Sequence, residues 1–351
     1  MFGQTIRDAA ERFGDRVLMR EESGRSLTYA DCDELSDGVA RTLLAAGVEA
    51  GSVVAITMRS GIDYLLTYAA AAKLGAITAG INPSLTATER NALLDLLTPD
   101  VVVDAPLAVG DPRVGALPVL GDDPERVVAI VFTSGTTGLP KGAIFRNRQL
   151  AAIARFDLGD DWQTTWGAGG HMFASTQFAH VGFMTKLPWY FHAGLTLHCL
   201  ERWRADAVLR LIDRYRITTL GVVAPQLALM LRHPVLADVD VSCVSHIIAG
   251  GAASSASLIT EAIGTFGAGY SVRYSSTESG GIGLATDFDA PLEETLSTVG
   301  RARPGVDVSV VDPLGTPLPP GEVGELCLRT PTAFDGYWRN PEATAQTLVD
   351  G

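Results

Sequence analysis

A run of hydroxyl residues and glycines ending in one lysine, at residues 133–142, is the segment best equipped for chemistry. It offers hydroxyls on Thr133, Ser134, Thr136 and Thr137, glycines at Gly135, Gly138 and Gly142, and the ammonium of Lys141. Glycine N–H groups can approach an anion closely because no Cβ blocks them, and the hydroxyls add further donors. We therefore predict a phosphate-binding loop here, with a flexible solvent loop as the alternative. It is not a Walker A loop, since the five-residue step from Gly135 reaches Pro140.

Two further segments carry residues suited to a nucleotide. The small residues Gly250, Gly251 and Ala252 follow the apolar run 244–249, and a flat ring could lie against their backbone. Residues 274–278 (YSSTE) combine an aromatic ring, three hydroxyls and a carboxylate. Each has a purely structural alternative, a tight turn leading to a helix capped by Ser254 in the first case and a solvated strand end in the second.

The order of these segments resembles that of the adenylate-forming superfamily, which includes acyl-CoA synthetases, peptide-synthetase adenylation domains and firefly luciferase. Further matching motifs are LTYAD at 27–31, NP at 82–83, GEL at 324–326 and GYW at 336–338. The resemblance covers nearly the whole chain.

The resemblance implies a role for each matching residue. The β and γ phosphates of ATP would be surrounded by Thr133, Ser134, Gly135, Thr136, Thr137, Gly138 and Lys141. Adenine would lie between Tyr274, with Ser275 and Ser276 beside it, and the wall formed by Gly250, Gly251 and Ala252. Thr277 would donate to the α-phosphate, and Glu278 would bind Mg²⁺ as a hard oxygen ligand. Ser275 stands where the family usually has glycine, so its backbone conformation is in question.

The acyl site is less sharply defined. His180 falls near the family's histidine motif, although Ala179 replaces an aromatic residue and His171 competes for the role; a satisfied core histidine is the alternative. Gly280, Gly281 and Gly283 would line the acyl site, and their lack of side chains favours a long or bulky acid. A simple glycine turn is an equal alternative.

The implied reaction is ATP-dependent activation of a carboxylic acid to acyl-AMP, followed by transfer to CoA. Carrier-protein loading, a binding module without turnover and a luciferase-like oxygenase remain open, whereas a serine hydrolase is set aside because no GxSxG turn occurs. The printed sequence ends at Gly351, before the family's ribose-binding aspartate and the mobile domain with its catalytic lysine. We therefore expect the large amino-terminal domain alone, poorly active by itself.

Composition restricts the partners. A net charge of −13 argues against nucleic acid, and ATP must then be held by local donors and Mg²⁺. Four widely spaced cysteines suggest neither a zinc site nor a disulfide framework. Without a signal peptide or a transmembrane segment, we predict a cytoplasmic protein. The oligomeric state, a homodimer included, is left open.

Alternation of apolar runs with helical patterns predicts an α/β fold with mostly parallel sheets. We expect strands at 53–57, 76–81, 101–104, 127–132, 217–223 and 244–249, with helices at 62–74, 86–97, 205–215, 225–232 and 254–266. We divide the chain into an α/β subdomain with the phosphate loop (1–165), an α/β subdomain with the adenine and acyl sites (166–290) and a β-rich, barrel-like subdomain (291–351).

Overall fold

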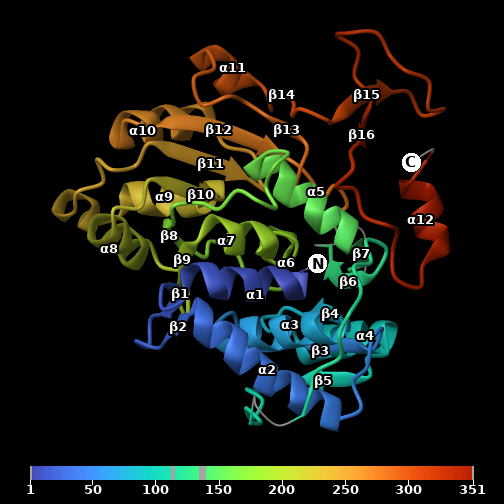
Figure 1. Cartoon of the computed structure of the whole chain (residues 1–351). Helices are drawn as coiled ribbons and strands as arrows, with labels where there is room; N and C mark the ends of the chain where they lie inside the picture. Colours follow the sequence, from blue (N-terminus) through green and yellow to red (C-terminus); the bar gives the residue numbers. More distant parts are fainter. Residues whose placement is uncertain (1, 112–114, 134–139, 350–351) are drawn as a thin grey trace.

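The computed structural model describes residues 2–111, 115–133 and 140–349 as an α/β protein. Its first sheet has five strands in the order β5-β3-β4-β6-β7, parallel except for the last pair. The strands are β3 (Val53–Ile56), β4 (Ile77–Gly80), β5 (Val101–Val103), β6 (Val127–Phe132) and β7 (Gly142–Arg146). The helices that alternate with these strands are α2 (Tyr29–Ala45), α3 (Ile62–Leu74) and α4 (Ala87–Leu97). Together they form the lower part of the molecule in Figure 1.

The second sheet also has five strands, in the order β10-β11-β12-β13-β14. They are β10 (Thr219–Val222), β11 (His246–Gly250), β12 (Gly269–Tyr274), β13 (Leu284–Ala285) and β14 (Arg301–Ala302). Its helical segments are α8 (Ala205–Tyr215), α9 (Ala224–Arg232), η1 (Pro234–Asp238), α10 (Ala256–Phe266) and α11 (Leu292–Ser297). This unit has its own apolar core and lies at the upper left of Figure 1.

A third sheet joins distant parts of the chain. Its order is β2-β1-β9-β8, formed by β1 (Val17–Glu21), β2 (Ser26–Thr28), β8 (Gly170–Phe173) and β9 (Leu195–Cys199). Helices α1 (Phe2–Phe13), α5 (Asn147–Leu158), α6 (Val181–Met184) and α7 (Leu187–Ala193) lie between the two larger sheets. The largest core cluster runs from Phe2 to Tyr337, so the subdomain boundaries at 165 and 290 stay a prediction.

The described part of 291–351 contains both strands and helices. It contributes β14 to the second sheet and a two-stranded ribbon of β15 (Asp307–Val311) with β16 (Glu325–Arg329), followed by α12 (Pro341–Thr347). These described strands do not close into a barrel of their own.

Most of the predicted elements are present, and several end at the predicted residue. Helix α3 spans the predicted 62–74 and ends at Gly75, whose φ of +73° is a left-handed cap. Thr28 caps α2 in a reciprocal box with Asp31. The expected cap of α10 is wrong by one residue: Ser255 accepts from the N–H of Leu258, whereas Ser254 accepts from the Tyr270 hydroxyl.

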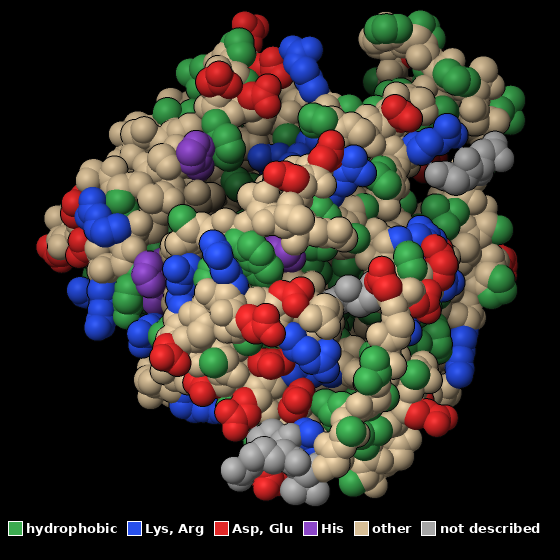
Figure 2. All heavy atoms as spheres, in the orientation of Figure 1, with side chains coloured by type: hydrophobic (Ala, Val, Ile, Leu, Met, Phe, Trp, Pro, Cys, Tyr) green, Lys and Arg blue, Asp and Glu red, His purple; other side chains and the backbone are tan. Residues whose placement is uncertain are grey.

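Acidic and basic side chains are interspersed over the face shown in Figure 2. Across the described ranges, no helix combines the length and the apolar character needed to cross a bilayer.

Candidate functional site

The two ends of the predicted phosphate loop are held together. Strands β6 and β7 pair in antiparallel register, with Phe132 opposite Gly142. One step further, the N–H of Thr133 donates to the Lys141 carbonyl at 2.9 Å, and the N–H of Lys141 donates to the Thr133 hydroxyl at 3.2 Å. The sequence between them, including Ser134, Gly135, Thr136, Thr137 and Gly138, lies outside the described residues. The β6–β7 pair therefore fixes where the loop leaves and rejoins the sheet.

Lys141 and Glu278 both contact Tyr337, one at the ring and the other at the hydroxyl. The Lys141 ammonium lies 4.8 Å from the centre of the Tyr337 ring, within the range of a cation–π contact. The Tyr337 hydroxyl donates to Oε1 of Glu278 at 2.6 Å. Burial and this hydrogen bond raise the pKa of Tyr337 to about 12, so the hydroxyl stays a donor near neutral pH. Two residues that the same resemblance assigns to one ATP site, 137 positions apart in the sequence, thus share one neighbour.

Segment 333–338, which carries Tyr337, is tied to β7 along its length. The N–H of Asp335 donates to Ile144, the N–H of Ile144 donates to Gly336, and the N–H of Trp338 donates to Gly142. On the other side, the N–H of Phe334 donates to the Glu278 carbonyl at 2.7 Å. The segment therefore bridges the loop hairpin and residue 278.

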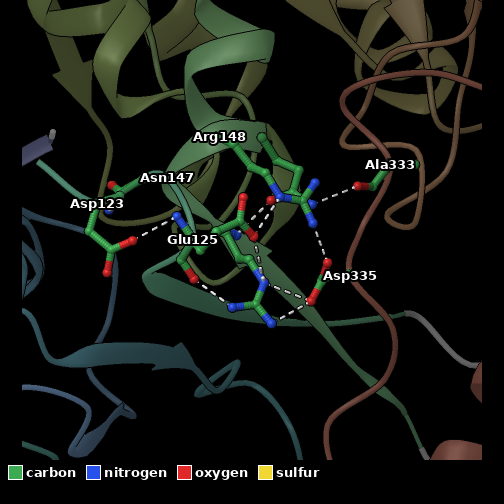
Figure 3. A network of polar contacts seen from close by, with 8 residues as sticks. Asp123, Glu125, Asn147, Arg148, Ala333 and Asp335 are labelled. Atoms are coloured by element: carbon green, nitrogen blue, oxygen red, sulfur yellow. Dashed lines mark hydrogen bonds and ion pairs between the residues drawn. The ribbon is translucent and has the colours of Figure 1, made fainter.

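Arginine side chains reinforce this bridge (Figure 3). Arg146 contacts Asp335 through Nε at 2.7 Å and through Nη2 at 2.6 Å, and Arg148 also pairs with Asp335. Arg148 donates to Glu125 at 3.1 Å as well. A guanidinium that contacts a carboxylate with two nitrogens fixes its orientation as well as its position. Sequence reasoning missed Asp335 and Tyr337, although the GYW motif that contains Tyr337 was recognised.

The predicted adenine walls lie at the ends of adjacent strands. Gly250 ends β11 opposite Arg273 of β12, and Tyr274 is the last residue of β12, with 44% of its surface exposed. Gly251 has a φ of +73°, which favours glycine. Ala252 is exposed next to it. A Cβ at residue 250 would lie 3.1 Å from the Arg273 carbonyl oxygen, so a larger residue there would require a small shift of β12.

Residues 275–283 form a tight turn behind Tyr274. Ser275 is not among the described non-glycine residues with positive φ, so the glycine usual at this place in the family is not needed here. Ser276 and Ser279 exchange backbone-to-hydroxyl hydrogen bonds, and the Thr277 carbonyl accepts from the N–H of Gly280. The turn presents Thr277 and Glu278, both half-buried, beside segment 333–338.

The turn itself explains why glycines stand at the predicted acyl site. Gly280 and Gly281 have φ values of +67° and +75°, and a Cβ on Gly283 would lie 2.3 Å from the Tyr274 carbonyl oxygen. A Cβ on Gly281 would face Val181 at 4.0 Å. Because Val181 follows His180, the structure brings the histidine segment next to this turn.

His180 and its competitor His171 occupy different surroundings. His180 is half-buried at the start of α6, and among the described residues its ring has no hydrogen-bond partner. Burial lowers its pKa below 6.5, which keeps it neutral at pH 7. His171 lies on β8, where its Nδ1 is 3.1 Å from Nε2 of His198 and its ring faces Tyr215. His171 therefore has a structural partner, whereas His180 does not.

Glu278 suits a metal ion that arrives with phosphates. Among the described residues, no three His, Cys, Asp or Glu side chains gather into a self-sufficient metal site. Mg²⁺ is commonly bound by one or two carboxylates plus substrate phosphates and water. The half-buried Glu278 carboxylate, with one oxygen bonded to Tyr337, fits that mode of binding.

A cavity of about 600 Å³ lies elsewhere, with Phe2, Lys73, Leu120, Arg148 and Trp162 in its lining. It includes none of the predicted site residues.

Comparisons with known proteins give the family and the fold of the chain. The sequence pattern of the family described as AMP-binding enzyme matches residues 6–338. The fatty acid–[acyl-carrier-protein] ligase ScoC of Streptomyces coeruleorubidus is 31% identical over 93% of this chain and 69% of its own length. A feruloyl-CoA synthase from an Amycolatopsis species is 29% identical over 97% of this chain and 72% of its own length.

The fold is shared with solved structures. The N-terminal domain of FACL13 from Mycobacterium tuberculosis superposes with a TM-score of 0.88 at 25% identity, covering 100% of this chain and 94% of that one. From its motifs, its fold and its match over residues 6–338, the chain belongs to the family of AMP-binding enzymes.

Proposed function

We propose that the protein is an ATP-dependent acid–thiol ligase. In the first step, an oxygen of the acid attacks the α-phosphorus of ATP, and the bond to the β-phosphate breaks. Pyrophosphate leaves with the electron pair, and an acyl-AMP remains. In the second step, a thiolate attacks the acyl carbon and AMP leaves.

The observation that carries this proposal is the meeting of Lys141, Tyr337 and Glu278 beside the closed neck of the glycine-rich loop. An ammonium and a carboxylate at one site suit a triphosphate that arrives with a divalent cation. Mg²⁺, when bound, would neutralise phosphate charge and favour departure of pyrophosphate. Thr133 and Lys141 would bind the β and γ phosphates, and Thr277 would donate to the α-phosphate.

The adenine and acyl ends of the site are proposed on the same basis. Adenine would lie between the Tyr274 ring and the backbone at 250–252, at the ends of adjacent strands. The acid would lie between the turn at 280–283 and the segment of His180. A neutral His180 adds no charge next to the apolar part of such an acid. We favour a fatty or other bulky acid.

CoA is our preferred acceptor, and carrier protein is the second candidate. The relatives differ on this point: ScoC is named for acyl-carrier-protein ligation, whereas the Amycolatopsis relative is named for CoA ligation. The choice does not alter the first step. We place the reaction in the cytoplasm, consistent with four free cysteines.

Acid-dependent exchange of labelled pyrophosphate into ATP tests the first step, measured on the full gene product with fatty and cinnamic-type acids. Adding CoA or a loaded carrier protein then identifies the acceptor by the thioester formed. The 351-residue chain is titrated with ATP in parallel. No exchange with any acid, together with no ATP binding, would refute the proposal.

A further inference from the structure

We propose that Tyr337 is a positioning residue that keeps the Glu278 carboxylate and the Lys141 ammonium in one site without letting them pair. Both charges then stay available, one for a divalent cation and one for phosphate. The inference rests on the proposed function, since it concerns how this site receives ATP with Mg²⁺.

The first step of the argument is the position of Tyr337. Its hydroxyl holds Oε1 of Glu278 at 2.6 Å, while the face of its ring holds the Lys141 ammonium at 4.8 Å from the ring centre. One side chain therefore contacts both charged groups through different parts of its surface. Within the described residues, neither Lys141 nor Glu278 has an ion pair, although they share this neighbour.

The separate contacts of Lys141 and Glu278 need an electrostatic explanation. Opposite charges that lie close together near a protein surface attract each other, although solvation and side-chain entropy offset part of this attraction. A carboxylate and a flexible lysine that share a neighbour would ordinarily approach each other. The Tyr337 ring gives the ammonium another partner through a cation–π contact, and the hydroxyl gives the carboxylate another partner through a hydrogen bond. Each charged group therefore has a favourable contact that does not join it to the other.

The second step of the argument concerns the hydrogen bonds that hold the backbone around Tyr337 in place. Tyr337 can separate the charges only if its own backbone is fixed. The N–H of Tyr337 donates to the Thr344 hydroxyl at 2.9 Å, and its neighbours Gly336 and Trp338 bond to Ile144 and Gly142 of β7. Asp335 forms ion pairs with Arg146 and Arg148, and Figure 3 shows Arg148 and Asp335 side by side. The segment that carries the Tyr337 ring is therefore hydrogen-bonded to β7, the strand that begins directly after Lys141.

Three variants separate the two contacts. Tyr337→Phe removes the hydroxyl and keeps the ring, Tyr337→Leu removes both, and Tyr337→Leu combined with Glu278→Gln also removes the carboxylate. ATP affinity of the 351-residue chain is measured by calorimetry without Mg²⁺ and at increasing Mg²⁺. Thermal melting of each variant verifies folding.

For Tyr337→Phe, we expect that about ten times more Mg²⁺ is needed to reach half of its full effect on ATP affinity. A factor of about ten corresponds to the loss of one hydrogen bond to a charged group. Affinity without Mg²⁺ should stay within about twofold, because Lys141 keeps its ring contact. In Tyr337→Leu, affinity without Mg²⁺ should fall about fivefold as Lys141 pairs with Glu278. Adding Glu278→Gln should restore it, which a merely structural role of Tyr337 would not produce.

The control is Tyr68→Phe, which removes a buried hydroxyl bonded to the Met184 carbonyl at 2.9 Å within the core. It should leave the Mg²⁺ dependence unchanged. If Tyr337→Phe and Tyr337→Leu both bind ATP as the wild type does at every Mg²⁺ concentration, the inference is wrong while the proposed function stands. If the wild-type chain binds no ATP at any Mg²⁺ concentration, the inference is wrong; if the full gene product also shows no acid-dependent exchange, the proposed function fails with it.

Discussion

Replacing the Glu278 carboxylate by an amide changes charge while keeping shape. Glu278→Gln should lower Mg²⁺-dependent adenylation in the full gene product by about a hundredfold or more, because an amide is a poor ligand for a hard cation. Pyrophosphate exchange gives the rate, and thermal melting should show an intact fold. Near-normal pyrophosphate exchange would show that Glu278 does not bind the metal ion.

Lys141 should matter less than Glu278. In Lys141→Ala we expect exchange to fall by roughly tenfold, since backbone and hydroxyl donors of the loop share the phosphate charge. The loss should appear mainly as a higher KM for ATP, measured by varying ATP at saturating acid. A larger loss in kcat than in KM would instead assign Lys141 to the transition state.

At the scale of single residues, motifs in the sequence predicted roles for Glu278 and Lys141. They did not predict that both residues contact Tyr337. Glu278 and Lys141 stand in recognisable segments, whereas Asp335 looks like an ordinary surface carboxylate in the printed sequence. Its role follows from pairing of 333–338 with β7, and such a long-range contact leaves no local periodicity.

Among the elements, segment 333–338 depends on one glycine. Gly336 has a φ of +116°, and an added Cβ would lie 2.8 Å from Cγ2 of Thr344. Gly336→Ala should therefore destabilise the protein by about 2–4 kcal/mol, combining backbone strain with a steric clash. It should also weaken the effect of Mg²⁺ on ATP binding, since Tyr337 follows directly.

Gly315→Ala is the matched control. Gly315 has a φ of +82°, but its added Cβ would meet no atom within 4 Å. Only backbone strain of about 1 kcal/mol should result, with Mg²⁺ dependence unchanged. Urea denaturation of the two variants compares them; equal losses would mean that the contact with Thr344 is unimportant.

Elements with strong local signals were predicted well. Helix α3 has buried residues on nearly all sides and a glycine at its end, and α4 has the box Thr86–Glu89 at its start. Helix α1 and strands β1, β8 and β9 were not predicted. These strands are short, and β1 depends on pairing with β9 far along the chain. Local propensity carries little information about such pairs.

On the scale of the whole molecule, Asp157 connects three regions of the chain. On α5, it pairs with Lys186 at 2.8 Å and Arg303 at 3.3 Å. Burial alone would raise its pKa, but the two cations outweigh burial and lower the pKa below 3.8. A carboxyl with a lowered pKa gives stability that is complete above its unfolded pKa and is lost as pH falls through its folded pKa.

Asp157→Asn should therefore lower the free energy of unfolding at pH 7 by roughly 1.5–3 kcal/mol. The difference from wild type should shrink as pH falls below about 4, since the wild-type carboxyl then gains a proton. Urea denaturation between pH 7 and pH 3 measures it. Asp160→Asn, which breaks the solvent-exposed pair with Arg155, should change little at any of these pH values. A constant difference across the range would contradict the assignment.

The sheet that joins β1 to β9 has a consequence for biosynthesis. The hydroxyl of Thr196 bonds to the carbonyl of Val17, a residue 179 positions earlier. At about 5–20 residues per second, a ribosome would release β1 roughly 10–35 seconds before its partner strand emerges. During that interval one edge of the amino-terminal strand is unpaired and open to pairing with another chain.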